Sequence, residues 1–180
     1  MLLCVSTYGQ DYKYAATAKN PFGLPNPNAP KEITDYKEMI GMCDCKSVAR
    51  IDQNTWADTV NMIWEFRYIM DGMAVQDLTY KKDGKHSGSI RQYNADSSKW
   101  YVHYYASAAA PAPLPVWEGN RIGNKIELLK KQPAPNGIPG YFKISFTDIS
   151  VNGFNWVGGW VNEQETISYP TWKIFCRRAH

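Results

Sequence analysis

The sequence lacks the features that mark several large functional classes. No apolar run approaches the roughly 20 residues that a membrane-spanning helix needs, so we expect no membrane span. The 20 basic and 17 acidic residues nearly balance, at a formal charge of +3, which argues against a nucleic-acid partner. A G-x-S-x-G elbow, an H-E-x-x-H pair and a phosphate-binding loop are all absent. We expect no cofactor.

Aromatic residues are what the chain has in excess. They make up 14% of it, with seven Trp and twelve Tyr, and flat side chains pack well on the pleated surface of a β-sheet. The 13 glycines and 11 prolines are spread between apolar runs. This spacing is typical of many strands joined by turns.

The stretch 61–80 predicts a hairpin that turns at Asp71-Gly72, because Gly tolerates the positive φ of tight hairpin turns. Strand periodicity divides its first arm into two faces. One face carries Glu65 and Arg67, and the other is apolar or aromatic throughout, with Met62, Trp64, Phe66 and Tyr68. We interpret the hairpin as a wall between a hydrophobic layer and a polar cavity that the charged face lines.

The chain divides into three segments. Residues 1–10 are similar to the second half of a bacterial secretion signal, although they lack its basic start. Residues 11–30 are rich in Pro and Asn and are interpreted as an extended linker. Residues 31–180 form the predicted domain, which opens with a short helix on the apolar stripe Ile33, Tyr36, Met39 and Ile40.

About ten strands follow the helix, at 44–52, 56–70, 73–81, 87–93, 99–107, 116–120, 125–130, 141–148, 153–161 and 171–178. An open sheet of short aromatic strands would leave two edge strands with unpaired backbone groups that can pair with other chains. Closure of the sheet removes both edges. The predicted fold is therefore all-β, an antiparallel up-and-down barrel wide enough to hold one small ligand.

Four cysteines bear on the compartment. Cys4 lies in the signal-like segment. In a closed barrel the first and last strands are neighbours, so a bridge from Cys43 or Cys45 to Cys176 is geometrically feasible. The alternative is three buried free thiols. A metal site at Cys43 and Cys45 has no second pair at ligand spacing, and we expect no metal.

Several segments together resemble the uncharacterised bacterial lipocalin-like domains of the calycin superfamily. They are Ile40-Gly41, WEFRYIMDGMAVQD (64–77), GSIRQYNADSSKWYVHYY (88–105), Trp117-Glu118-Gly119 and FTDISVNGFNWVGGW (146–160). The resemblance covers residues 31–178. Gly41-Met42-Cys43 has Cys where the lipocalin G-x-W signature has Trp, so the likeness is to the broader superfamily. It implies a ligand-binding barrel and assigns no activity.

Several polar residues are candidates for the lumen if their strand faces align. The candidate ligand-binding residues are Glu65, Arg67, Asp77, Arg91, His103, Tyr105, Trp117 and Trp160. Buried charges must be mutually paired, and a surplus Arg suits an anionic group that it can hold with two hydrogen bonds. The alternative is a solvated Glu65–Arg67 pair and an ordinary hydrogen-bonded His103.

The sequence thus favours binding of a small, partly apolar and anionic ligand in an aromatic-lined lumen. A second hypothesis is an isomerase or hydrolase on the same barrel, with Glu65, Asp77 or His103 as acid or base. A third is a structural or protein-interaction module. The signal-like segment predicts a periplasmic or secreted protein, and a monomer and a homodimer both stay open.

Overall fold

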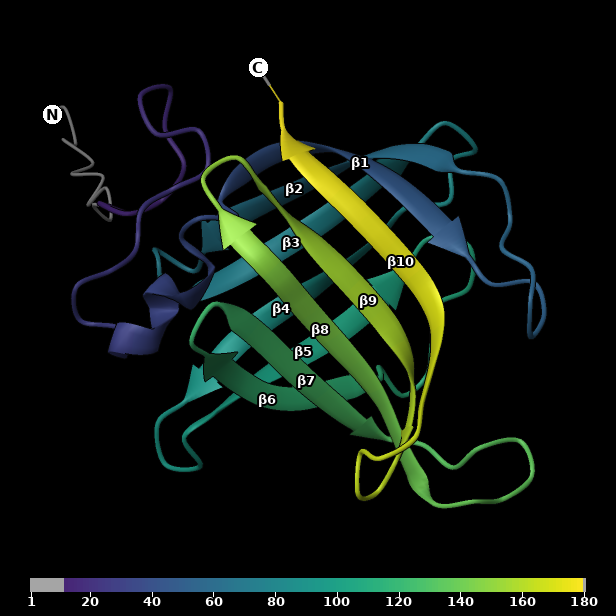
Figure 1. The fold of residues 1–180 in the computed structure, drawn as a ribbon. Coiled ribbons are helices and arrows are strands. Elements are labelled where there is room, and N and C mark those ends of the chain that lie inside the picture. The colour runs from purple at the N-terminus through teal and green to yellow at the C-terminus, as the bar shows by residue number, and fades with distance from the viewer. Residues whose placement is uncertain (1–11, 180) are drawn as a thin grey trace, which may run out of the picture.

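A computed structural model describes residues 12–179, and its strands form one closed antiparallel barrel (Figure 1). The ten strands are β1 Gly41–Ala49, β2 Val60–Ile69, β3 Ala74–Lys81, β4 Ser87–Asn94, β5 Lys99–Ala106, β6 Val116–Ile122, β7 Lys125–Lys131, β8 Gly140–Ser150, β9 Gly153–Asn162 and β10 Ser168–Arg178. Each strand pairs with its neighbour in sequence, and β1 pairs with β10 to close the ring. The predicted up-and-down barrel is confirmed.

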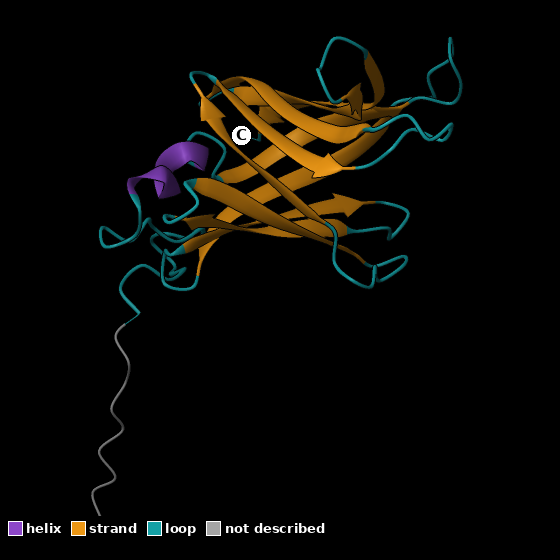
Figure 2. Cartoon of the chain, turned by 90° about the horizontal axis from the view of Figure 1, so that it is seen from below, coloured by secondary structure: helices purple, strands orange, loops and turns teal. Residues whose placement is uncertain are grey.

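The expected helix is a short 3₁₀ turn, η1, Lys31–Tyr36, and it covers one end of the barrel (Figure 2). A 3₁₀ turn has three residues per turn, so side chains three apart lie in line. Ile33, Tyr36 and Met39 follow this spacing, and all three are buried. Trp100 Nε1 donates to Asp35 Oδ2 (2.9 Å), and Arg121 donates to Glu38 Oε2 (2.9 Å), which ties this end segment to β5 and β6.

The segment expected to be a linker is bound to the β2–β3 hairpin along its described part. Tyr68 N donates to Phe22 O (2.8 Å), and Asn26 N donates to Gly72 O (3.1 Å). Gly72 has φ 81°, and a Cβ there would lie 2.4 Å from Leu24 O. Glycine at this turn therefore meets both the backbone conformation and the close passage of the N-terminal segment.

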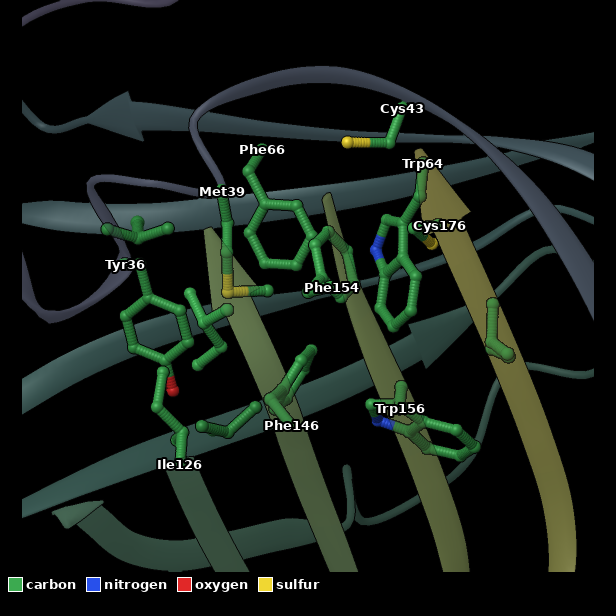
Figure 3. Close-up of a cluster of buried hydrophobic side chains, with 14 of the residues drawn as sticks. Tyr36, Met39, Cys43, Trp64, Phe66, Ile126, Phe146, Phe154, Trp156 and Cys176 are labelled. Carbon is green, nitrogen blue, oxygen red and sulfur yellow. The ribbon is translucent and has the colours of Figure 1, made fainter. Parts of the chain in front are cut away.

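The hairpin's apolar face points into the barrel, which corrects our assignment of its charged face to the lumen. Trp64, Phe66 and Tyr68 are 0–5% exposed, with Phe66 fully buried. Near η1, Trp64 and Phe66 meet Phe146 of β8 and Phe154 of β9 (Figure 3). Ring centroids lie 5.5 Å apart for Trp64–Phe154 and 5.7 Å for Phe66–Phe154. Side chains thus fill the η1 half of the interior.

Within residues 12–179, the structure contains no helix with the length and hydropathy of a membrane span.

Candidate functional site

The half of the barrel away from η1 contains a cavity of about 340 Å³. Its lining comes from the strand ends opposite η1, such as Lys81 at the end of β3 and Lys130 near the end of β7. The aromatic side chains of this lining are Trp64, Tyr104, Trp117, Phe142, Trp156 and Trp172. The volume lies within the ~300–1,000 Å³ range of small-molecule sites.

A buried ionic network forms the floor of this cavity. Asp77 Oδ2 accepts from Trp64 Nε1 (2.9 Å), and Asp77 Oδ1 accepts from Arg91 Nε (3.0 Å) and from the Ser89 hydroxyl. The side chains of Arg91 and Asp77 are 4% and 5% exposed. A buried carboxylate needs such donors because each unpaired buried charge is strongly unfavourable. Both carboxylate oxygens of Asp77 are therefore occupied by this network.

Arg91 is also enclosed by rings. Its guanidinium carbon lies 5.0 Å from the Tyr36 ring centroid and 5.4 Å from those of Phe66 and Phe146. Burial favours the neutral guanidine, but the Asp77 carboxylate and its hydrogen bonds outweigh that effect and raise the pKa of Arg91 above its ordinary value. Arg91 therefore stays charged and separates the packed half of the barrel from the cavity.

Two lysines stand at the mouth of the cavity, each against an indole. Lys81 Nζ lies 5.2 Å from the Trp172 ring centroid, and Lys130 Nζ lies 4.8 Å from that of Trp117. Within residues 12–179, neither lysine forms an ion pair with a carboxylate. The floor pair is neutral overall, so these two ammonium groups leave the cavity with a net positive charge.

Three of the predicted ligand-binding residues line the cavity: Asp77, Arg91 and Trp117. Trp160 lies nearby, where its Nε1 donates to Gln132 O (3.0 Å), and its side chain is outside the lining. Gln132 itself contributes to the lining. Trp160 therefore supports the mouth through Gln132.

The other four predicted residues lie on the outer face of the barrel, and this corrects the expected convergence on the lumen. Paired residues of an antiparallel ladder share a face. Asp77 pairs with Phe66 and not with Glu65, while Arg91 pairs with Val102 and not with His103. The four outward residues are Glu65, Arg67, His103 and Tyr105.

The outward residues have partners of their own there. Arg67 Nε donates to Glu65 Oε1 (2.5 Å), and Tyr105 Oη accepts from Gln76 Nε2 (2.8 Å). His103 pairs in the ladder with Ile90, on the face opposite the cavity lining. The three candidate acids or bases, Glu65, Asp77 and His103, therefore do not share one site.

Sequence reasoning missed several lining residues, above all Lys81, Lys130, Trp156 and Trp172. A signal for Lys81 was present, because positions 77, 79 and 81 of one strand share a face. Lys130 had no comparable signal, since its position at the mouth depends on the closed ring. The hydroxyls of Thr79, Ser87 and Ser89 were also missed, although strand periodicity places Thr79 on the face of Asp77 and both serines on the face of Arg91.

The seam of the barrel carries a disulfide between Cys45 of β1 and Cys176 of β10, which are direct ladder partners. Cys43 is a free, buried thiol, and burial raises its pKa. Of the two bridges left open by the sequence, the structure contains the one from Cys45. Cys4 and the signal-like segment 1–10 lie outside the described residues.

Comparisons with known proteins add little to this geometry. No family model matches the sequence, and neither does any curated protein. Among solved structures, the chain is similar to a protein of unknown function from the DUF3598 family of Nostoc punctiforme PCC 73102. The identity is 5% and the TM-score 0.29, over 83% of this chain and 100% of that one. Such a likeness carries no argument about ligand or activity.

Proposed function

We propose that the barrel binds a small amphipathic molecule, with its apolar part among the indoles and an anionic group at the mouth. The observation that carries this proposal is the cavity of about 340 Å³ with six aromatic side chains in its lining. Ring faces contribute apolar contact in a site where a few polar groups fix orientation. At ~30 Å³ per water, the space equals roughly eleven waters, which suits a ligand of one or two rings or a medium alkyl chain.

The charge at the mouth supports an anionic group on the ligand. Lys81 and Lys130 have no carboxylate partner within the described chain, and each ammonium lies beside an indole that partly shields it from water. A carboxylate between them would gain charge-assisted hydrogen bonds. The Asp77–Arg91 pair would stay intact beneath it.

Filling the cavity should weaken binding strongly. Ile144 lines the cavity, and Ile144→Trp would place a second ring system in the space that the ligand needs. We expect dodecanoate or naphthoate to bind at least about tenfold more weakly to this variant in isothermal titration calorimetry. Ile122→Trp, at a site 66% exposed at the η1 end, is the control and should bind as the parent does. Equal binding by both variants would place the ligand elsewhere.

Removing the mouth charges should weaken binding and its salt dependence together. In Lys81→Gln/Lys130→Gln, the affinity for dodecanoate should fall about three- to tenfold at low ionic strength, because two favourable charge contacts are lost. The gap between parent and variant should narrow as salt is added. Lys46→Gln/Lys82→Gln removes the same charge from exposed positions. If this control weakens binding as much, the effect is one of net charge only.

We further propose that the domain, residues 31–180, is a lipocalin-like member of the calycin superfamily that works in the periplasm or outside the cell. The ten-strand up-and-down barrel with a covered end supports the first part. The Cys45–Cys176 disulfide supports the second, since such bonds persist in oxidising compartments. Mass spectrometry of intact protein from a periplasmic fraction, with and without reductant, tests the compartment.

A further inference from the structure

The cavity has two chemically different walls that face each other. The Ser and Thr hydroxyls of its lining, at Thr79, Ser87 and Ser89, lie with Asp77 on the neighbouring strands β3 and β4. In the ten-strand ring, β8 and β9 stand five places from β3 and β4, on the opposite side. There the lining consists of Phe142, Ile144 and Trp156. One edge of a bound ligand would therefore meet hydroxyls, and its opposite side would meet rings.

The hydroxyl wall offers acceptors to a ligand. Ser89 Oγ donates its hydrogen to Asp77 Oδ1, which leaves only lone pairs on that oxygen. Thr79 Oγ1 donates to Ser87 O (3.1 Å), so the Ser87 hydroxyl can direct its hydrogen at Thr79 Oγ1 (2.8 Å). Ser87 Oγ then also presents lone pairs. Both serines thus match a ligand that carries an O–H or N–H donor on this edge.

The polar groups of this wall lie at successive depths in the cavity. Lys81, Thr79 and Asp77 alternate down one face of β3, and the ladder places Ser87 beside Thr79 and Ser89 beside Asp77. Two residues of a strand span about 7 Å. Along the strand, the Lys81 backbone therefore lies about 7 Å from the Thr79–Ser87 level and about 14 Å from the Asp77–Ser89 level. A ligand held at Lys81 would meet Ser87 at the first level and Ser89 one level deeper.

Ring contacts on the other wall favour a flat ligand. Trp156 and Trp172 meet edge to face, with centroids 5.4 Å apart at 79°, and Trp117 and Phe142 do so at 6.1 Å and 76°. In an edge-to-face pair, one ring contributes only its edge to the contact. The face of that ring stays available to stack on a third ring. An alkyl chain would gain apolar contact here but no such stacking.

We infer that the ligand class is a planar aromatic carboxylate with a hydroxyl or N–H donor at the end remote from the carboxylate. This inference rests on the proposed function and narrows it. The carboxylate would lie between Lys81 and Lys130, the ring system against Trp156, and the donor on Ser87 or Ser89. The recognition is non-covalent throughout.

Four carboxylates measured by calorimetry on the full chain test the ligand class. They are naphthoate, a hydroxynaphthoate with its hydroxyl on the ring remote from the carboxylate, the methoxy analogue of that compound, and dodecanoate. We expect hydroxynaphthoate to bind about three- to tenfold tighter than naphthoate, the range for one net hydrogen bond. The methoxy compound should lose this gain because it has no donor. Dodecanoate should bind more weakly than hydroxynaphthoate.

Serine variants locate the hydrogen bond. Ser87→Ala or Ser89→Ala should bring the hydroxynaphthoate-to-naphthoate affinity ratio close to one, because the acceptor for the ligand's donor is lost. Ser168→Ala, at an exposed position in β10, should keep the parent ratio. The affinity ratio within one variant is insensitive to a modest loss of stability, and two serines are tested, so one poorly folded variant does not decide the outcome.

The outcomes separate this inference from the proposed function. If dodecanoate binds in the cavity as tightly as hydroxynaphthoate or more tightly, the ligand class is wrong and the proposed function stands. If the hydroxyl gives no gain, or both serine variants keep the parent ratio, the donor assignment is overturned. If none of the four carboxylates binds, the proposed function fails as well.

Discussion

Arg91→Met should lower the free energy of unfolding by about 3–5 kcal/mol. The change removes the only cation that pairs with Asp77 among the described residues and leaves a carboxylate that is 5% exposed with just the Trp64 and Ser89 donors. Loss of one partner of a buried ion pair typically has this effect, because the remaining charge stays desolvated without compensation. The guanidinium's contacts with the Tyr36 and Phe66 rings are lost at the same time. Chemical denaturation monitored by circular dichroism measures the difference.

Lys99→Met is the control for this prediction. It also removes the cation of an ion pair, Lys99–Glu118, but there the two side chains are 43% and 46% exposed. Water and salt screen such a pair, so we expect a change of about 1 kcal/mol or less. The double variant Asp77→Leu/Arg91→Met should recover much of the stability lost in Arg91→Met. Equal losses from Lys99→Met and Arg91→Met would contradict a special role for the buried pair.

The strands could be predicted from the sequence because their signals are local. Alternation of apolar side chains and the turn at Asp71-Gly72 act over a few residues, and the ten expected strands correspond one to one with β1–β10. Closure was predictable from the number of aromatic strands and the need to remove sheet edges. Only the type of the helix was predicted wrongly, because the spacing of Ile33, Tyr36 and Met39 fits a 3₁₀ turn as well as an α-helix.

The inner face could not be chosen from local signals. Alternation along β2 yields an apolar face and a charged face, and either can border a cavity that binds a polar ligand. The ladder decides, because it places Asp77 opposite Phe66 and so turns one acidic side chain inward and Glu65 outward. A one-residue shift of that register would have placed both carboxylates on the same face. Register depends on the whole ring of strands, which no short stretch of sequence encodes.

The depth of the cavity was equally beyond sequence reasoning. Met39, Phe66 and Phe154 fill the barrel near η1, and a lumen remains only beyond Arg91 and Asp77. The abundance of Trp predicted an aromatic-lined lumen. It did not reveal that Trp64 would close the floor through its bond to Asp77 while Trp172 borders the mouth. That division follows from where each strand enters the barrel relative to η1.

The disulfide at the seam between β1 and β10 should contribute much of the protein's stability. Cys45 and Cys176 are 131 residues apart in sequence, so their bond restricts the unfolded chain strongly. In the chain-entropy account, a loop of this length corresponds to about 5 kcal/mol, and measured losses on removing native disulfides are about 2–5 kcal/mol. We expect Cys45→Ala/Cys176→Ala to lose about 3–5 kcal/mol in chemical denaturation, and the parent with reductant to lose a similar amount.

Cys43→Ala is the control for the seam, because Cys43 lies on the same face of β1 and is a free thiol. Its loss should be about 1 kcal/mol, the effect of removing one small buried group, and this variant should stay as sensitive to reductant as the parent. The double variant should be insensitive to reductant. If Cys43→Ala instead abolished the reductant effect, the bridge to Cys176 would come from Cys43, and the pairing of β1 with β10 would have to shift by two residues to allow it.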